Sequence, residues 1–412
     1  MRLTCRVPTP LILLLAALAT SACTQIAPPS SPPSAPEPPA IRRPLALWTQ
    51  AEREYRFAHW DTYVSKTRVV SRGNRVQALS TGAPLPTFLP GGEGAKQLDQ
   101  YATNIKLAGI VVLHDGKVRL ERYALGHSAA GRWTSFSVAK SLTSTLVGAA
   151  IKDGLIGSVE DPITRYIPAL RGSAYDGVTV HQLLTMTSGV KWNEDYTDVK
   201  SDVALFYSTP PEPGMDATVS YMKKLPREAP PGTKWLYKTG ETNLLGVLVS
   251  QATKKTLAAY ASEKIWALVG MEQDAAWQLD RTDHEQGGCC LHAATRDYAR
   301  LGQFVLDGAR IDGKSIVPEG WFTAATRKQA EIGRPGRGYG YLWWTSDNGS
   351  FDAIGIHGQM IHIDPARRLV VAINSAWPVA TGQAQSAARF ALINAIAAAV
   401  DAEGRGRELT KP

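Results

Sequence analysis

Alternating apolar and polar residues between Ala108 and Gly126 predict a β-hairpin. The two runs flank Asp115-Gly116, a dipeptide that favours a tight turn between antiparallel strands. An apolar stretch follows at once, beginning at Ser137, and it predicts a helix. This order places a candidate helix N-terminus directly after the first strands of a sheet.

Helical patterns then dominate the chain, and strand-like runs return only near its end. The expected helices lie at 141–156, 180–186, 242–268 and 295–308, and the late strands at 338–344, 353–363 and 368–374, before an Ala-rich helix at 383–401. Early strands must therefore pair with late strands. The pattern predicts an α+β fold, an antiparallel sheet flanked by helices with an inserted helical lobe, and an active site between lobe and sheet.

The expected organisation has four parts. Residues 1–22 read as a signal peptide, because basic residues precede an apolar stretch that is too short to span a bilayer. A Pro-rich linker, extended rather than packed, is expected at 23–45. The main domain covers 46–400, and a C-terminal tail covers 401–412. The sheet part of the main domain lies at about 100–140 and 310–400, and its helical lobe lies at about 141–309. Residues 46–100 are expected to pack on the domain as an N-terminal extension.

Thr20-Ser-Ala-Cys23 resembles a bacterial lipobox, although position 20 is usually Leu in that motif. We therefore expect a lipid on Cys23, a membrane tether, and a location in the periplasm or outer membrane. The alternative is ordinary cleavage near Cys23 and a free secreted protein. No later stretch of the sequence is long and apolar enough to span a bilayer.

Composition removes several other classes of function. The net charge is +8, but the basic residues are scattered and not interleaved with aromatic residues, so nucleic-acid binding has no support. Cys289 and Cys290 are adjacent, and we expect two packed small residues rather than a disulfide. His357 and His362 are five apart, which would place them on opposite sides of a strand, and no other cluster has zinc spacing. We expect no metal and no cofactor.

Ser137 and Lys140 carry the most specific candidate chemistry. Their spacing places both side chains on one face of the helix. A buried lysine near a helix N-terminus shifts toward its neutral form, which can act as a base for the Ser137 hydroxyl. The N–H of Ser137 would point toward a developing oxyanion.

Two later segments supply candidate partners for this pair. Tyr237 lies in a loop before a helical pattern, where a phenol with a lowered pKa could relay the proton. Gly355-Ile-His-Gly-Gln359 is expected on a late strand, with the N–H of Ile356 as second oxyanion donor and His357 lining the site. Lys238-Thr-Gly240 precedes a helical pattern, so we interpret it as coincidence and expect Lys238→Ala to leave turnover nearly unchanged.

The segments Ser137-Val-Ala-Lys140, Val178–Gly189 and Pro231–Tyr237 resemble the class C β-lactamase-related serine hydrolases. The resemblance covers about residues 105–400, and within it the chain is most similar to the 6-aminohexanoate-dimer hydrolases. It implies Ser137, Lys140 and Tyr237 as catalytic residues, the N–H groups of Ser137 and Ile356 as oxyanion hole, and Tyr196 as a substrate-binding residue.

The expected function is an exported serine hydrolase that cleaves a small amide or ester through an acyl-enzyme. Thr239 stands where class C β-lactamases carry Asn, and the late Lys-Thr-Gly strand is missing, so efficient β-lactam hydrolysis is not expected. A carboxylesterase and a D-alanyl peptidase on the same scaffold stay open. So does an envelope-binding lipoprotein with a degenerate site.

Overall fold

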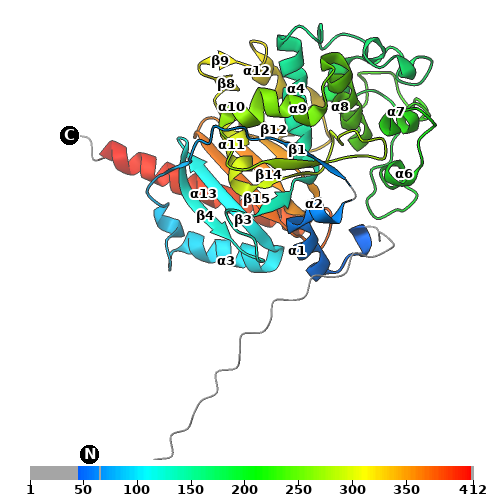
Figure 1. Ribbon diagram of the computed structural model, residues 1–412. Coiled ribbons are helices and arrows are strands. Elements are labelled where there is room, and N and C mark those ends of the chain that lie inside the picture. Colours follow the sequence, from blue (N-terminus) through cyan, green and yellow to red (C-terminus); the bar gives the residue numbers. More distant parts are fainter. Residues whose placement is uncertain (1–44, 65, 410–412) are drawn as a thin grey trace, which may run out of the picture. The chain divides into compact units, whose positions relative to one another are not determined.

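A large sheet forms the centre of the protein (Figure 1). The computed structural model describes residues 45–64 and 66–409, so the expected signal peptide, Cys23 and nearly all of the linker lie outside the described residues. Within them the sheet has the order β10-β11-β12-β13-β14-β15-β3-β4-β2. Its strands are β2 Ser80–Thr81, β3 Leu107–His114, β4 Lys117–Tyr123, β10 Ala330–Glu331, β11 Arg337–Tyr339, β12 Trp344–Ser346, β13 Phe351–Ile354, β14 Met360–Asp364 and β15 Leu369–Ser375.

The predicted pairing of early and late strands is confirmed. β3 and β4 form the expected hairpin, and β15 lies antiparallel to β3 with Ala372 opposite Val111. Alternate residues of β3 face opposite sides, so Val111 belongs to one hydrophobic cluster and Val112 to another. The sheet is therefore buried on both faces.

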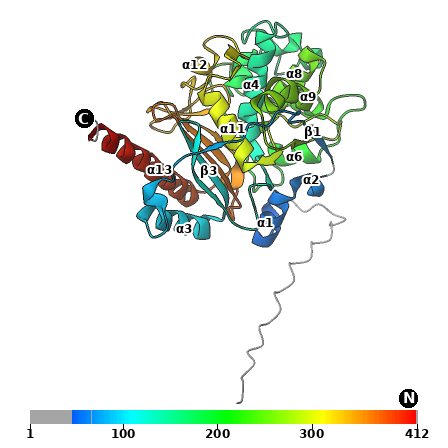
Figure 2. The ribbon, with the colours of Figure 1, turned by 60° about the vertical axis from the view of Figure 1, so that its left-hand side comes forward.

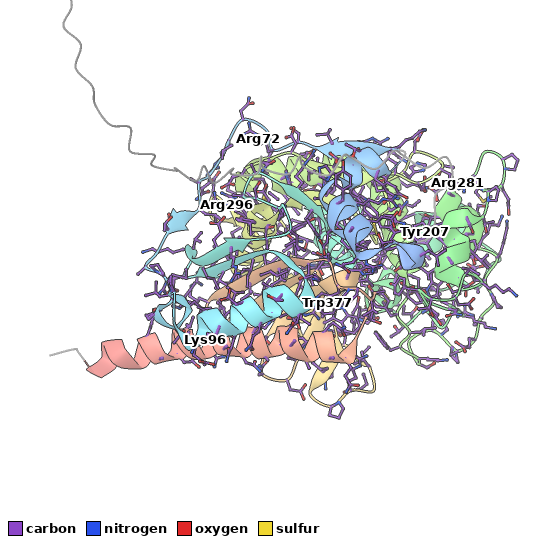
Figure 3. All side chains as sticks on the ribbon, turned by 90° about the horizontal axis from the view of Figure 1, so that it is seen from below. Arg72, Lys96, Tyr207, Arg281, Arg296 and Trp377 are labelled. Atoms are coloured by element: carbon purple, nitrogen blue, oxygen red, sulfur yellow. A yellow bond between two sulfur atoms is a disulfide. The ribbon has the colours of Figure 1, made fainter. Side chains whose placement is uncertain are left out.

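Helices cover both faces of the sheet, as Figures 1 and 2 show. α3 and α13 pack side by side on one face (Figure 3), where Leu98, Ile110 and Ile396 share a cluster. α4, α8 and α11 contribute to the cluster on the other face. The helices are α1 Gln50–Ala58, α2 Trp60–Tyr63, α3 Glu93–Ile105, α4 Ala139–Lys152, α5 Val180–Leu184, α6 Asp202–Ser208, α7 Ala217–Met222, α8 Thr239–Thr253, α9 Leu257–Ala261, α10 Ala267–Val269, α11 Thr295–Leu306, α12 Trp321–Ala325 and α13 Gln383–Leu409.

Four details differ from the sequence-based expectation. The run 338–344 forms two short strands, β11 and β12, and the run 353–363 is interrupted between β13 and β14 by the 3₁₀ turn η7 Ile356–Gly358. The pattern at 242–268 breaks at Lys254, whose φ is 58°. α13 continues to Leu409, into the expected tail.

A second sheet was not predicted. It has the order β1-β6-β7-β5, formed by β1 Thr67–Val70, β6 Ala275–Gln278, β7 Leu291–Ala294 and β5 Arg132–Thr134. β5 leads straight into Ser137, so this sheet anchors the segment before the candidate nucleophile. A further two-stranded sheet consists of β8 Arg310–Ile311 and β9 Lys314–Ser315.

The segment 46–64 packs on this domain as expected. Trp48, Phe57 and Trp60 form an aromatic cluster with Phe136, the residue before Ser137. Phe57 is fully buried in it. Among the helices of the described residues, none has the length and apolarity that crossing a membrane requires.

Candidate active site

Ser137 and Lys140 lie together at the start of α4. Ser137 is in the 3₁₀ turn η3 Phe136–Val138, which leads directly into α4, and Lys140 is in the first turn of that helix. Lys140 Nζ lies 3.0 Å from Ser137 Oγ. The predicted juxtaposition of hydroxyl and amine is therefore present.

Three acceptors surround the amine of Lys140, whose side chain is almost fully buried. Besides Ser137 Oγ, Nζ contacts Thr239 Oγ1 at 3.0 Å and the carbonyl oxygen of Gly288 at 2.6 Å. Burial lowers the pKa of Lys140 to about 7, although the carboxylate of Glu194 acts in the opposite direction. A neutral amine beside a serine hydroxyl can accept its proton near neutral pH.

Tyr237 stands on the lobe side of this pair. It lies in the loop before α8, and Lys140 Nζ is 5.1 Å from the centre of its ring. Its ring stacks on Trp344 of β12 at 5.6 Å between centroids. Burial, and then the charge of Glu194, raise the pKa of Tyr237, while a hydrogen bond with Ser137 acts against that rise. The expectation of a lowered pKa is therefore wrong, because the surroundings are aromatic and anionic, and Tyr237 is a neutral phenol.

Glu194 is a site residue that the sequence analysis did not single out. Its carboxylate accepts hydrogen bonds from the backbone N–H of Thr239 at 2.9 Å and from the hydroxyl of Tyr196 at 2.6 Å. The Thr239 hydroxyl and Trp192 Nε1 also donate to it. Since Thr239 contacts Lys140, a buried network joins the carboxylate to the amine. A single acidic residue in a polar loop gives no sequence signal for such a role.

Tyr196 lies beside this network. Its hydroxyl donates to Glu194, and burial, followed by the charge of Glu194, raises the pKa of Tyr196. The structure therefore brings the expected substrate-binding residue next to the catalytic candidates.

The backbone at Gly355 and Ile356 approaches the nucleophile from the sheet side. A Cβ on Gly355 would lie 3.1 Å from the backbone nitrogen of Ser137 and 2.5 Å from the carbonyl oxygen of Ser135. A glycine is therefore needed for so close an approach. The expectation that this segment lies on a strand is wrong, because Ile356 begins the turn η7. Gly355, the residue before this turn, therefore brings the start of the turn close to the backbone nitrogen of Ser137.

His357 does not line the site. Its ring packs against Phe57 and Phe136 on the side of the N-terminal segment, and Nδ1 contacts the carbonyl oxygen of Trp377 at 2.8 Å. Burial lowers its pKa to about 4. His357 is 3% exposed among these aromatic residues, which corrects its assignment as a substrate-binding residue.

Lys238 is fully buried, and its amine contacts residues of its own segment rather than Ser137 or Lys140. Its Nζ lies 3.6 Å from a carboxylate oxygen of Glu241 and 3.2 Å from the carbonyl oxygen of Leu236. Lys238 precedes α8 rather than lying on a late strand, as expected. The amine therefore pairs with groups inside the lobe and is not available to a substrate.

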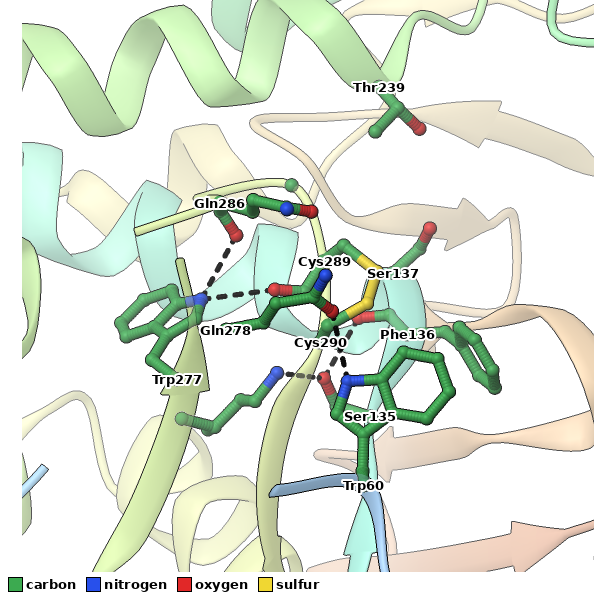
Figure 4. The surroundings of a disulfide bond; sticks show 12 residues. Trp60, Ser135, Phe136, Ser137, Thr239, Trp277, Gln278, Gln286, Cys289 and Cys290 are labelled. Carbon is green, nitrogen blue, oxygen red and sulfur yellow. Dashed lines mark hydrogen bonds between the residues drawn. A yellow bond between two sulfur atoms is a disulfide. The ribbon is translucent and has the colours of Figure 1, made fainter. Parts of the chain in front are cut away.

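The expectation for Cys289 and Cys290 is wrong. The two adjacent residues form a disulfide, with their Cα atoms 3.7 Å apart (Figure 4). Adjacency alone argued against such a bond, but Cys290 adopts a φ of 69°, a conformation that the sequence does not reveal.

One group of potential metal ligands occurs among the described residues, formed by Asp216, Asp280 and His284. His284 Nδ1 lies 2.8 Å from Asp216, and hydrogen bonding to this carboxylate raises the pKa of the imidazole. An ion pair that joins the start of α7 to a neighbouring turn accounts for the arrangement. The two histidines have different partners: His362 contacts Asp352 at 2.6 Å, and His357 contacts the carbonyl oxygen of Trp377.

Comparisons with known proteins find relatives over most of the chain. The β-lactamase family profile matches residues 95–395. The 6-aminohexanoate-dimer hydrolase of Paenarthrobacter ureafaciens is 31% identical over 310 residues, which are 71% of this chain and 77% of that protein. A β-lactamase of Pseudomonas fluorescens is 24% identical over 40% of this chain and 44% of its own length.

Solved structures support the fold. A Bacillus anthracis protein with a suggested 6-aminohexanoate-dimer hydrolase activity superposes with a TM-score of 0.73 at 23% identity, over 85% of this chain and 94% of that one. A penicillin-binding protein homologue from Caulobacter crescentus gives a TM-score of 0.60 at 17% identity, over 77% and 99% of the two chains.

Proposed function

The chain belongs to the β-lactamase family, and from this premise we propose that it is a serine hydrolase that cleaves small amides or esters through an acyl-enzyme. The observation that carries the proposal is the buried amine of Lys140, 3.0 Å from Ser137 Oγ, with a pKa lowered to about 7. A lysine in that state is a base matched to neutral pH.

In the proposed reaction, Ser137 Oγ attacks the carbonyl carbon while Lys140 accepts its proton. The N–H groups of Ser137 and Ile356 stabilise the oxyanion, a contribution that is typically worth about 3 kcal/mol for one donor. Tyr237 donates a proton to the leaving group and is reprotonated from Lys140. The phenol acts in its neutral form, which agrees with the raised pKa of Tyr237. A water molecule then releases the acyl group by the reverse proton path.

We assign the substrate to small linear amides of the 6-aminohexanoate-dimer type. The relative from Paenarthrobacter ureafaciens, named for that dimer, supports the assignment. The stacked rings of Tyr237 and Trp344 provide an apolar wall beside Ser137 that suits an aliphatic chain. Burial of Lys238 removes the lysine that a Lys-Thr-Gly motif would offer to a β-lactam carboxylate, so rapid β-lactam hydrolysis is not part of the proposal.

The test compares hydrolysis of the linear 6-aminohexanoate dimer and of p-nitrophenyl butyrate by the purified protein. We expect both to be cleaved and both activities to be lost in Ser137→Ala. Cleavage of the ester alone would keep Ser137 as nucleophile and change the assignment to a carboxylesterase. Neither activity, together with no labelling by a fluorophosphonate probe, would overturn the proposal.

We also propose that the protein is exported and tethered by a lipid on Cys23. Support comes from the basic and apolar N-terminal residues and from the Pro-rich stretch before residue 45. The mass of the N-terminal peptide of the mature protein tests this: a diacylated Cys23 is expected, and an unmodified peptide that begins elsewhere would contradict it.

A further inference from the structure

The loop 286–290 links the elements that carry the candidate catalytic residues. Its peptide groups are bonded to both helices of the site: the Thr143 hydroxyl of α4 donates to Gly287 O at 2.7 Å, and Gly288 N–H donates to Asn243 Oδ1 of α8 at 2.7 Å. Lys140 Nζ contacts Gly288 O at 2.6 Å, the shortest of its three polar contacts. The loop therefore sets one of the three directions in which the amine is held.

Close packing leaves the loop little room to move toward α8. A Cβ on Gly288 would lie 2.8 Å from the carbonyl oxygen of Thr239 and 3.1 Å from Asn243 Oδ1. The chain can bring Gly288 O to Lys140 only because glycine stands at this position.

The disulfide closes the other end of this loop. Cys290 N–H donates to the carbonyl oxygen of Phe136, the residue before Ser137, at 3.2 Å. Trp277 Nε1 of β6 donates to the carbonyl oxygen of Cys289 at 3.0 Å. Figure 4 shows the disulfide in this loop between Trp277 and the segment Ser135–Ser137. The two adjacent cysteines and their S–S bond form a small covalent ring. This ring thus lies between Gly288 O, which accepts from Lys140, and the backbone of Phe136 beside Ser137.

The backbone of Cys290 depends on that ring. Its φ of 69° lies in the left-handed region, which is unfavourable for a non-glycine residue. The bond to Cys289 restrains the dipeptide, and a freed Cys290 can relax toward negative φ. Because Cys290 N–H and Gly288 O are only two residues apart, such a change displaces both contacts with the catalytic segment.

We propose that the Cys289–Cys290 disulfide is a redox-responsive positioning element, which holds Gly288 O against Lys140 and thereby supports turnover. The inference rests on the proposed function, because it concerns the amine assigned there as the base. Cys289 is half-buried and Cys290 is 3% exposed, so a small thiol reaches the pair through Cys289. Both cysteines also belong to the hydrophobic cluster that includes Phe136 and Ile356, next to the proposed oxyanion hole.

The chemistry balances with a dithiol such as dithiothreitol. Its thiolate attacks Cys289 Sγ, and the S–S bond breaks with its electron pair on Cys290 Sγ, which takes a proton. The second thiol of the reagent then displaces Cys289 Sγ, which is protonated, and the reagent closes its own disulfide. The protein gains two electrons and two protons, and the reagent is oxidised.

The experiment uses the full chain in its oxidised and its dithiothreitol-reduced form. Peptide mass after alkylation gives the state of the 289–290 pair without interference from Cys5 and Cys23. We expect the reduced form to lose about tenfold or more in kcat for p-nitrophenyl butyrate, with a smaller change in KM, and to recover on reoxidation. The pH profile of kcat should move as well, because the surroundings of Lys140 change.

Cys289→Ser/Cys290→Ser is the matched control. It should behave like the reduced protein, and dithiothreitol should leave its rate unchanged. Equal kcat and equal pH profiles in the two redox forms would overturn the inference, as would free thiols at 289 and 290 in air-purified protein. Loss of circular dichroism on reduction would make the bond a general structural one, also against the inference. If the oxidised form neither hydrolyses the ester nor labels with a fluorophosphonate, the proposed function itself fails.

Discussion

At the scale of single residues, the amine of Lys140 is the group on which the site depends. Burial lowers its pKa to about 7, so the reactive neutral form is present above that pH and is lost below it. We therefore expect kcat/KM to rise with pH through about 7 and to fall by about tenfold per pH unit on the acid side. A pH–rate profile with p-nitrophenyl butyrate measures this, and an acid limb near pH 4 would point to a carboxylate as base.

The charge of Glu194 raises the pKa of Lys140, so a substitution of Glu194 should change the pH dependence of the reaction. Glu194→Gln should move the acid limb of kcat/KM to lower pH. It should also lower kcat. Thr239 and Tyr196 donate to the two different oxygens of the carboxylate, and in the amide one of these oxygens becomes an NH₂ group, which cannot accept. Asp195→Asn, in the same loop but exposed, is the control and should leave both the limb and kcat as they are. An unmoved limb in Glu194→Gln would remove Glu194 from the network around Lys140.

Tyr237 is the third residue whose role can be measured. Tyr237→Phe keeps the ring stacked on Trp344 but removes the hydroxyl that transfers the proton. We expect kcat to fall by at least about a hundredfold, the usual range for a lost general acid. Tyr55→Phe, on α1 and half-buried, serves as the control for a phenol removed elsewhere. Near-normal turnover in Tyr237→Phe would contradict the proton-transfer role.

At the scale of elements, the sequence predicts the helices and turns whose formation depends on neighbouring residues. The β3–β4 hairpin follows from Asp115-Gly116, and α11 follows from its apolar periodicity. Strands as short as β5 and β6 carry too few residues for alternation to be visible, so the second sheet was missed. The sequence predicts a strand at η7 because its glycine and apolar residues resemble one, but contacts with Ser137 and Trp377 accompany a turn there.

The candidate site divides along the same line. Ser137 and Lys140 are three residues apart on one helix, so their contact is local and could be predicted. Glu194 lies 45 residues before Thr239 in the chain, and it reaches Lys140 only through the Thr239 hydroxyl. The disulfide joins adjacent residues with Cys290 in the left-handed region, a backbone conformation that the sequence pattern does not reveal. Contacts between distant segments are therefore the part that a single sequence does not reveal.

The start of α8 offers a prediction about stability. Lys238 and Glu241 are fully buried, and removing the amine leaves a buried carboxylate without its counter-charge. Lys238→Met should lower the free energy of unfolding by about 3–5 kcal/mol in urea titrations near pH 8, while kcat per folded molecule stays close to that of the parent. Lys234→Met, which loses only a surface pair with Glu228, should cost about 1 kcal/mol or less.

The pH dependence of this loss has a definite sign. Burial raises the pKa of Glu241, so the folded state binds a proton more readily than the unfolded state does. Without Lys238 that protonation relieves the unpaired charge. The deficit of Lys238→Met should therefore be smaller at pH 5 than at pH 8, and a deficit that grows on acidification would contradict the buried pair.

At the scale of the whole molecule, the N-terminal segment is part of the catalytic domain although it precedes the family match, which begins at residue 95. Phe57 meets Phe136 edge-on, with ring centroids 5.0 Å apart, and is fully buried. Because Phe136 adjoins Ser137, the segment supports the backbone that positions the nucleophile.

Phe57→Ala should lower the free energy of unfolding by about 3–5 kcal/mol and should slow fluorophosphonate labelling of Ser137. Leu47→Ala, in the same segment but 62% exposed, should change stability by about 0.5 kcal/mol or less. Equal urea midpoints for the two variants would mean that the segment lies on the domain without stabilising it.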